Sequence, residues 1–142
     1  MTLARLRKES YFIGGLMAVT AVLGFFAYFV DSTNQSELYL LVTLLQFVIA
    51  CFFIFTTKKL NPNEENTSSL FKLSCLAGIL FSLVYGAMFL HSSYKEFGLQ
   101  LAALAPSIMP TVVLFAFFVR FYRKSRLIHE LKNKRIKGVG DN

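Results

Sequence analysis

Four long blocks of this chain contain no Asp, Glu, Lys, Arg or His side chain. The blocks are Tyr11–Val30, Leu38–Thr57, Leu73–Leu90 and Phe97–Val119. Each is close to the ~20 residues that an α-helix needs to cross a hydrocarbon core about 30 Å thick, whereas buried helices of soluble proteins normally carry charges on one face. The blocks therefore predict an all-α integral membrane protein, an antiparallel bundle of four transmembrane helices over about 11–30, 38–57, 71–90 and 97–121.

The positions of the basic residues predict the orientation of this bundle. With four spans, the N-terminal lead 1–10, the second connection and the C-terminal tail 122–142 share one side of the membrane. Together with the adjoining ends of the spans, they carry every one of the 15 Lys and Arg residues except Lys95. The positive-inside rule places such segments in the cytoplasm. We therefore expect both termini to be cytoplasmic, and we interpret the net charge of +7 as a topology signal.

The basic tail is expected to be partly helical, because no helix breaker occurs between Arg120 and Gly138. Each basic residue near an anionic membrane surface contributes about 1 kcal/mol of attraction. Anionic lipid headgroups are therefore the expected partner of the tail. An apolar ridge on the same segment could instead dock a soluble protein (Leu127, Ile128 and Leu131). Nucleic acid is not an expected partner, since Tyr122 is the only Phe, Tyr or Trp residue in 122–142 for base stacking.

Small residues recur at helical spacing in the first and third spans. In the third span the spacing is a strict four residues, and the first span carries a similar set (Ser74, Gly78, Ser82 and Gly86; Gly14, Ala18 and Ala21). Spacings of three and four place side chains on one helix face. In lipid, such faces allow close helix–helix contact. We therefore expect spans one and three to pack against each other through these small residues.

Gln46 is the one strongly polar side chain near the middle of the second span. An amide in hydrocarbon needs a hydrogen-bond partner, so Gln46 is expected to face the bundle. Two interpretations are open. Gln46 could make one interhelical hydrogen bond worth about 1 kcal/mol, or it could lie on a polar pathway for a substrate, together with Tyr85.

Two prolines stand four residues apart in the fourth span, at Pro106 and Pro110. Each removes one helical hydrogen bond, so the helix is expected to kink there. The freed carbonyl groups need partners such as the Ser107 hydroxyl. The kink could be a static bend, or it could line a cavity as broken helices do in some transporters.

The connections between the spans and the two cysteines are expected to have structural roles. Thr67, Ser68 and Ser69 are candidate caps for the third span, and His91–Glu96 is expected to be a solvated turn. Cys51 and Cys75 are expected to be small buried hydrophobic residues. The first span is too long for a cleaved signal peptide.

The sequence contains no motif that points to catalysis, a metal or a cofactor. No Asp, Glu, Lys, Arg or His side chain lies inside the four charge-free blocks, although ion-coupled transporters normally place an ionisable side chain within a span. The layout resembles small four-span bacterial inner-membrane proteins through Gly14-Gly15-Leu16 and Tyr122–Arg126, which implies a location but no function. The first expectation is a non-catalytic protein that contacts a membrane partner or a second copy of itself. The alternative is a small transporter or channel subunit, and an enzyme ranks last.

Overall fold

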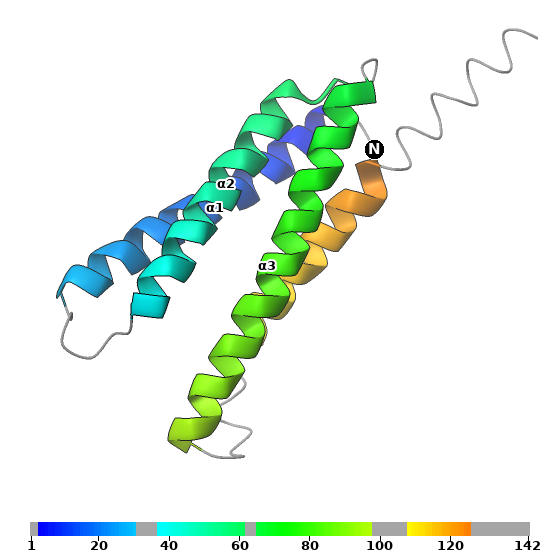
Figure 1. The fold of residues 1–142 in the computed structure, drawn as a ribbon. Coiled ribbons are helices and arrows are strands. Elements are labelled where there is room, and N and C mark those ends of the chain that lie inside the picture. The colour runs from blue at the N-terminus through cyan, green and yellow to red at the C-terminus, as the bar shows by residue number, and fades with distance from the viewer. Residues whose placement is uncertain (1–2, 31–36, 62–64, 98–107, 126–142) are drawn as a thin grey trace, which may run out of the picture. The chain divides into compact units, whose positions relative to one another are not determined.

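The computed structural model describes residues 3–30, 37–61, 65–97 and 108–125, and almost all of them are helical. The helices are α1 (Leu3–Val30), α2 (Glu37–Lys59) and α3 (Glu65–Phe97), followed by a helical segment over residues 108–125 (Figure 1). The segments Leu3–Val30, Glu37–Lys59 and Asn66–His91 are long and apolar enough to cross a membrane. The prediction of an all-helical chain with membrane-spanning helices is confirmed to this extent. The fourth predicted span, 97–121, lies partly outside the described residues.

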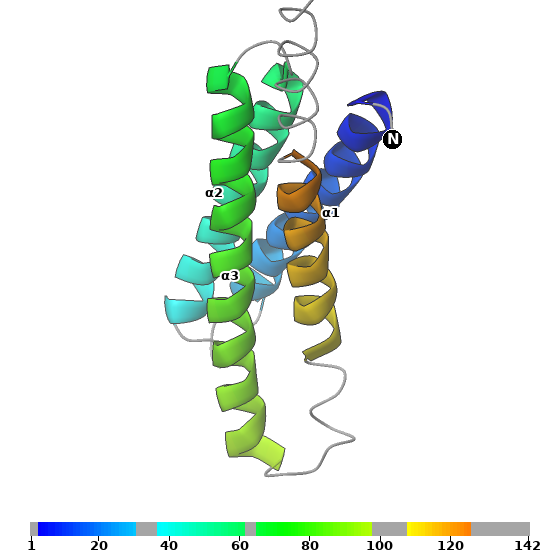
Figure 2. The ribbon, with the colours of Figure 1, turned by 90° about the vertical axis from the view of Figure 1, so that its right-hand side faces the viewer.

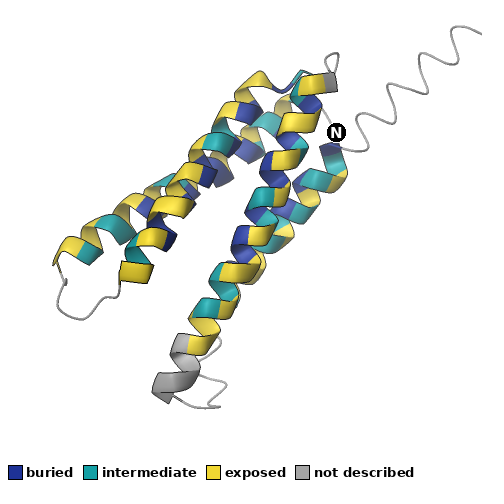
Figure 3. Cartoon of the chain, in the orientation of Figure 1, coloured by how far each residue is buried: buried dark blue, intermediate teal, exposed yellow. Residues whose placement is uncertain are grey.

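Many large apolar side chains lie on the outside of the helices. Phe12, Phe26 and Leu41 are 70%, 63% and 63% exposed, and many Leu, Val and Phe side chains resemble them. The buried faces, drawn dark blue in Figure 3, include hydroxyl and amide side chains such as Thr56 and Gln46. A water-soluble monomer rarely exposes apolar patches of this extent. An exterior with so many large apolar side chains is suited to contact with lipid.

The chain divides into two compact units, Met1–Ser74 and Cys75–Asn142. In the first unit, α1 and α2 form an antiparallel hairpin (Figure 1). Their buried residues recur every three or four positions, among them Ile13, Met17 and Ala21 on α1 and Ile49 and Phe53 on α2. This spacing produces one continuous contact face on each helix. At the open end of the hairpin, the Arg7 guanidinium donates a hydrogen bond to the Leu60 carbonyl oxygen.

In the second unit, the later part of α3 and the segment 108–125 lie side by side (Figure 2). Gly78 lies against Phe118, and Gly86, further along α3, lies against Thr111. Because the residue numbers rise on one helix as they fall on the other, these two helices are antiparallel.

Two helices begin earlier than the charge-free blocks predicted. α1 includes the basic lead, whose residues favour helix and whose Arg5 Nε lies 3.1 Å from Glu9 Oε1 at the i,i+4 spacing. α3 begins at Glu65, so Thr67 lies inside its first turn and the prediction of a cap before the helix is wrong. The Thr67 hydroxyl nevertheless bonds to the preceding loop, since it accepts from the Asn61 N–H at 3.1 Å and donates to the Asn61 carbonyl at 2.9 Å.

The expectation of a turn at His91–Glu96 is also wrong, because α3 remains helical to Phe97. No Gly or Pro interrupts this stretch before Gly98. α3 contains 33 residues and is therefore about 50 Å long at 1.5 Å per residue. A hydrocarbon core is only about 30 Å thick, so the polar residues at the ends of α3 can extend beyond it without ending the helix.

Candidate helix-packing and polar sites

Gly78 and Gly86 on α3 each accommodate a side chain from the segment 108–125. A Cβ atom added at Gly78 would lie 2.5 Å from two ring carbons of Phe118, a side chain that is fully buried. A Cβ atom added at Gly86 would lie 2.6 Å from Cγ2 of Thr111. These separations are well below van der Waals contact. The two glycines therefore form holes that the neighbouring helix fills.

In the hairpin of α1 and α2, two glycines likewise accommodate side chains of the neighbouring helix. A Cβ atom at Gly14 would lie 2.7 Å from Cγ1 of Ile54, and one at Gly24 would lie 2.6 Å from Cγ2 of Thr43. Gly15, directly beside Gly14 in the chain, has no such neighbour within 4 Å. The requirement for glycine is thus specific to the face that meets the next helix.

The partners of these glycines differ from the prediction. Spans one and three were expected to meet through their small residues, but the atoms nearest to Gly14 belong to α2 and those nearest to Gly78 belong to the segment 108–125. That prediction is wrong for these contacts because a hole left by glycine accepts a bulky side chain as readily as a second small residue. In each unit, the helix that follows in the chain supplies this side chain.

The two hairpins also share a sequence pattern that spacing within single spans did not reveal. Gly78 follows Gly14 in the chain by the same number of residues as Phe118 follows Ile54. At this separation, five residues of one segment recur in the other: Leu6, Lys8, Ser10, Gly14 and Leu16 correspond to Leu70, Lys72, Ser74, Gly78 and Leu80. Comparison of the chain with itself would have indicated the equivalent roles of Gly14 and Gly78.

Ser74 forms a polar contact between α3 and α2. Its Oγ lies 2.8 Å from Oγ1 of Thr56, and both side chains are buried. Ser74 Oγ also lies 2.8 Å from the Phe71 carbonyl oxygen, and Thr56 Oγ1 lies 3.0 Å from that of Phe53. Each hydroxyl has one proton, so two protons serve three contacts. One hydroxyl donates across the helix pair while the other donates to its own helix.

The two residues whose carbonyl oxygens lie next to these hydroxyls, Phe53 and Phe71, also contact each other through their rings. Phe53 and Phe71 are fully buried, and their rings stack with centroids 5.6 Å apart. Apolar surroundings strengthen the electrostatic part of a hydrogen bond and raise the cost of leaving a polar group unpaired. The Thr56–Ser74 contact is therefore both specific and sensitive to substitution.

Gln46 faces α1. Its side chain is 9% exposed, and its Nε2 donates to Thr20 Oγ1 at 2.8 Å and to the Met17 carbonyl oxygen at 3.2 Å. The Thr20 hydroxyl in turn donates to the Met17 carbonyl at 3.0 Å. Both amide protons are thus used in contacts between α1 and α2. This geometry supports the interpretation of Gln46 as an interhelical hydrogen-bonding residue.

The other predicted packing residues are less clearly involved. Ala21 is buried and lies in the contact face of α1, whereas Ala18 is half-buried. Ser82 is buried, and its hydroxyl donates to the Gly78 carbonyl of its own helix at 2.8 Å. Tyr85 is half-buried, and its ring contacts Phe81 and Phe89 on the same helix.

The predicted kink is described only in part. Pro106 and Ser107 lie outside the described residues. Pro110 is exposed and lies within the helical segment 108–125. Thr111, next to it, lines a groove of about 320 Å³ with eight other residues (Ser82, Leu83, Gly86, Ala87, Leu90, Ile108, Val112 and Phe115). The Thr111 hydroxyl is buried and has no hydrogen-bond partner among the described residues, a property that sequence spacing did not indicate.

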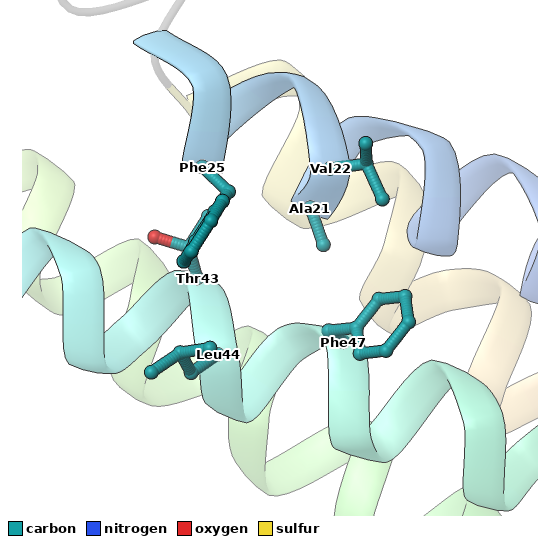
Figure 4. A pocket seen from close by; sticks show the side chains of 6 residues that line it. All are labelled: Ala21, Val22, Phe25, Thr43, Leu44 and Phe47. Atoms are coloured by element: carbon teal, nitrogen blue, oxygen red, sulfur yellow. The ribbon is translucent and has the colours of Figure 1, made fainter. Parts of the chain in front are cut away.

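A smaller hollow of about 210 Å³ lies between α1 and α2 (Figure 4). Its walls are Ala21, Val22 and Phe25 of α1 and Thr43, Leu44 and Phe47 of α2. The Thr43 hydroxyl, its one polar group, donates to the Tyr39 carbonyl of its own helix. The hollow thus offers an apolar surface suited to a lipid chain.

Within the described ranges, no three His, Cys, Asp or Glu side chains gather where they could hold a metal ion. Both cysteines are free thiols. Cys75 is buried as expected, but Cys51 is exposed, so the expectation of burial is wrong for Cys51. The exposed side of α2 includes several large apolar side chains, and a thiol is compatible with such an apolar face.

No protein-family model, curated protein or solved structure matches this chain. Its class therefore rests on its own geometry. The long apolar helices, the apolar exterior and the internal polar contacts between helices are those of a helical membrane protein.

Proposed function

We propose that this chain is a non-catalytic, multi-pass membrane protein that acts through helix contacts with a membrane partner or with a second copy of itself. An accessory, regulatory or immunity-type role belongs to this class. The observation that carries the proposal is the use of interior polar groups for internal contacts, as at Gln46, Ser82 and the Thr56–Ser74 pair. The apolar helix exteriors and the basic ends are then the surfaces available for recognition.

The proposed location is the bacterial inner membrane, with both termini in the cytoplasm. The distribution of Lys and Arg supports this orientation. It also supports anionic lipid headgroups as contacts of the basic tail. The tail beyond residue 125, including its apolar ridge, lies outside the described residues.

Purification in mild detergent after cross-linking in the membrane, followed by mass spectrometry, tests the proposal. Photoreactive residues at the exposed positions Phe26 and Leu45 should cross-link to a stoichiometric partner or to a second copy. A photoreactive residue at the buried Phe53 is the matched control and should cross-link only within the chain. Exclusive cross-linking of Phe26 and Leu45 to lipid would contradict the proposal.

The alternative, a small transporter or channel subunit, is favoured by one observation. The buried, unpartnered Thr111 hydroxyl lines the groove with Ser82 and Gly86, and an unpaired polar group in a membrane is costly unless water or a solute reaches it. Gln46 and Pro110 remain candidate pathway residues under this alternative. Water access to the groove distinguishes the two functions.

A further inference from the structure

A further cleft, of about 410 Å³, lies at the basic end of the segment 108–125. Its described lining consists of Phe115, Ala116, Val119, Arg120, Arg123 and Lys124. Residues three and four positions apart share one helix face. This face therefore has an apolar part followed by a part with three cationic side chains.

The position of this division matches the boundary of a membrane. From residue 108 to Val119 the segment has no charged residue, and Arg120 is the first charge after that stretch. Arg120 and Arg123 are exposed, and Lys124 is half-buried. Long basic side chains at such a position place their stems against apolar surface and their charged ends at the headgroup level.

The three cations suit a phosphate group. The guanidinium group of arginine has several N–H donors in a planar arrangement that matches phosphate oxygens, and lysine adds a compact positive charge. The adjoining wall of Phe115, Ala116 and Val119 is apolar. A ligand complementary to the whole cleft is therefore an amphiphile with an anionic, phosphate-bearing head and a hydrocarbon chain.

We propose that this cleft binds one anionic phospholipid molecule, with its headgroup at Arg120, Arg123 and Lys124 and an acyl chain along Phe115 and Val119. This inference rests on the membrane location and on the proposed contact of the basic end with anionic lipid. It adds a defined site to what would otherwise be diffuse attraction between a charged end and a charged surface.

The absence of Trp from the chain permits a direct test. In a Phe115→Trp variant, the single indole would report on the acyl chain in the cleft. The purified protein is placed in vesicles of phosphatidylcholine and phosphatidylglycerol, with bromine on the chains of one lipid at a time. Quenching by each brominated lipid gives the relative affinity of the site. One basic residue near the surface contributes about 1 kcal/mol, or about fivefold, so a preference for phosphatidylglycerol of at least about fivefold is expected.

Two triple variants, each of which loses three positive charges, show which basic residues cause the preference for phosphatidylglycerol. In the Phe115→Trp background, R120Q/R123Q/K124Q should bring the affinity ratio close to one. The control K58Q/K59Q/K72Q removes three basic residues elsewhere and should retain the preference. If the first variant fails to fold, R123Q alone, at an exposed position, should still lower the ratio by up to about fivefold.

Three results would overturn the site. They are no preference in the parent, equal loss in both triple variants, and loss of the preference in millimolar inorganic phosphate, which would assign the cleft to free phosphate. The test uses the purified chain in defined lipids and needs no protein partner. Its failure is therefore distinguishable from failure of the proposed partner contact, which the cross-linking experiment measures separately.

Discussion

The ring of Phe118 lies directly against the Cα position of Gly78, in the space where any other residue would place its Cβ atom. Phe118 is fully buried, so its ring has little freedom to move aside. The contact fixes the separation of α3 from the following helix and the register between them. Ile54 has the equivalent relationship to Gly14 in the first unit. These two contacts are determinants of packing in the described chain.

Substitution at Gly78 tests this relationship. Gly78→Ala places a methyl group 2.5 Å from the Phe118 ring, and such overpacking typically costs about 1–3 kcal/mol. Gly78→Leu should disrupt the fold completely. Leu80→Ala should have little effect, because Leu80 is largely exposed. Unfolding in mixed micelles, followed by circular dichroism during a titration with SDS, measures the difference.

Gly14 and Gly15 provide a matched pair of neighbours. Gly14→Ala meets Ile54 at 2.7 Å and should destabilise the α1–α2 hairpin, whereas Gly15→Ala meets no atom within 4 Å and should cause no loss. The same SDS titration compares them. Equal destabilisation by the two variants would mean that the glycines serve a backbone role rather than the packing role described above.

The Gln46–Thr20 hydrogen bond should be measurable by a double-mutant cycle. Gln46→Leu and Thr20→Val each remove one partner of the 2.8 Å contact. Interhelical hydrogen bonds in membranes contribute about 0.6–2 kcal/mol, so the two losses should couple by a value in that range. Thr20→Ser retains the hydroxyl and is the control. Strict additivity of Gln46→Leu and Thr20→Val would show that this bond does not hold the hairpin.

The shared protons of Thr56 and Ser74 lead to a different coupling. When Thr56→Val or Ser74→Ala removes one hydroxyl, the other can still donate to its own helix carbonyl. The parent thus makes two of the three bonds at a time, each single variant keeps one bond and the double variant keeps none. The losses of the two single variants should therefore add to the loss of the double variant within about 0.3–0.5 kcal/mol. Unfolding midpoints of the four proteins give these losses. A double variant that loses clearly less than the sum would contradict the shared-proton arrangement.

The two native cysteines should react at different rates. Cys51 is exposed on α2, whereas Cys75 is buried. In folded protein in mild detergent, a small apolar maleimide should modify Cys51 first, and SDS unfolding should make both react. Intact mass of the parent and of Cys51→Ala follows the reaction. Rapid modification of the remaining thiol in folded Cys51→Ala would contradict the burial of Cys75.

The sequence was sufficient to predict helices and apolar spans, because charge-free stretches of this length have few other stable structures in lipid. Helix ends were less predictable. Residues on both sides of the third block continue α3 because no Gly or Pro stops it, and charge alone does not end a helix. The partners of Gly14 and Gly78 depended on which bulky side chain lies opposite each glycine, a tertiary relationship that small-residue spacing does not contain.

For the polar residues too, one property was predictable from the sequence and others depended on tertiary structure. The burial of Gln46 was predictable, since an amide in hydrocarbon requires a partner, but its acceptors on α1 were not. The unpartnered hydroxyl of Thr111 was not predictable at all. It depends on the position of Thr111 against Gly86 and on the lack of a hydrogen-bond partner in the described part of the chain, and neither is encoded in local spacing.

Under the proposed function, the helices act through contacts with other helices and water does not enter between them. Single cysteines at Ser82 and Thr111, in a chain with Cys51→Ala and Cys75→Ala, test it most directly. In intact membranes, a membrane-impermeant maleimide applied from either side should leave both unlabelled, while a cysteine at the exposed Lys59 should be labelled from one side only. Labelling at Ser82 or Thr111, with the protein still folded, would contradict the claim and favour a transporter or channel.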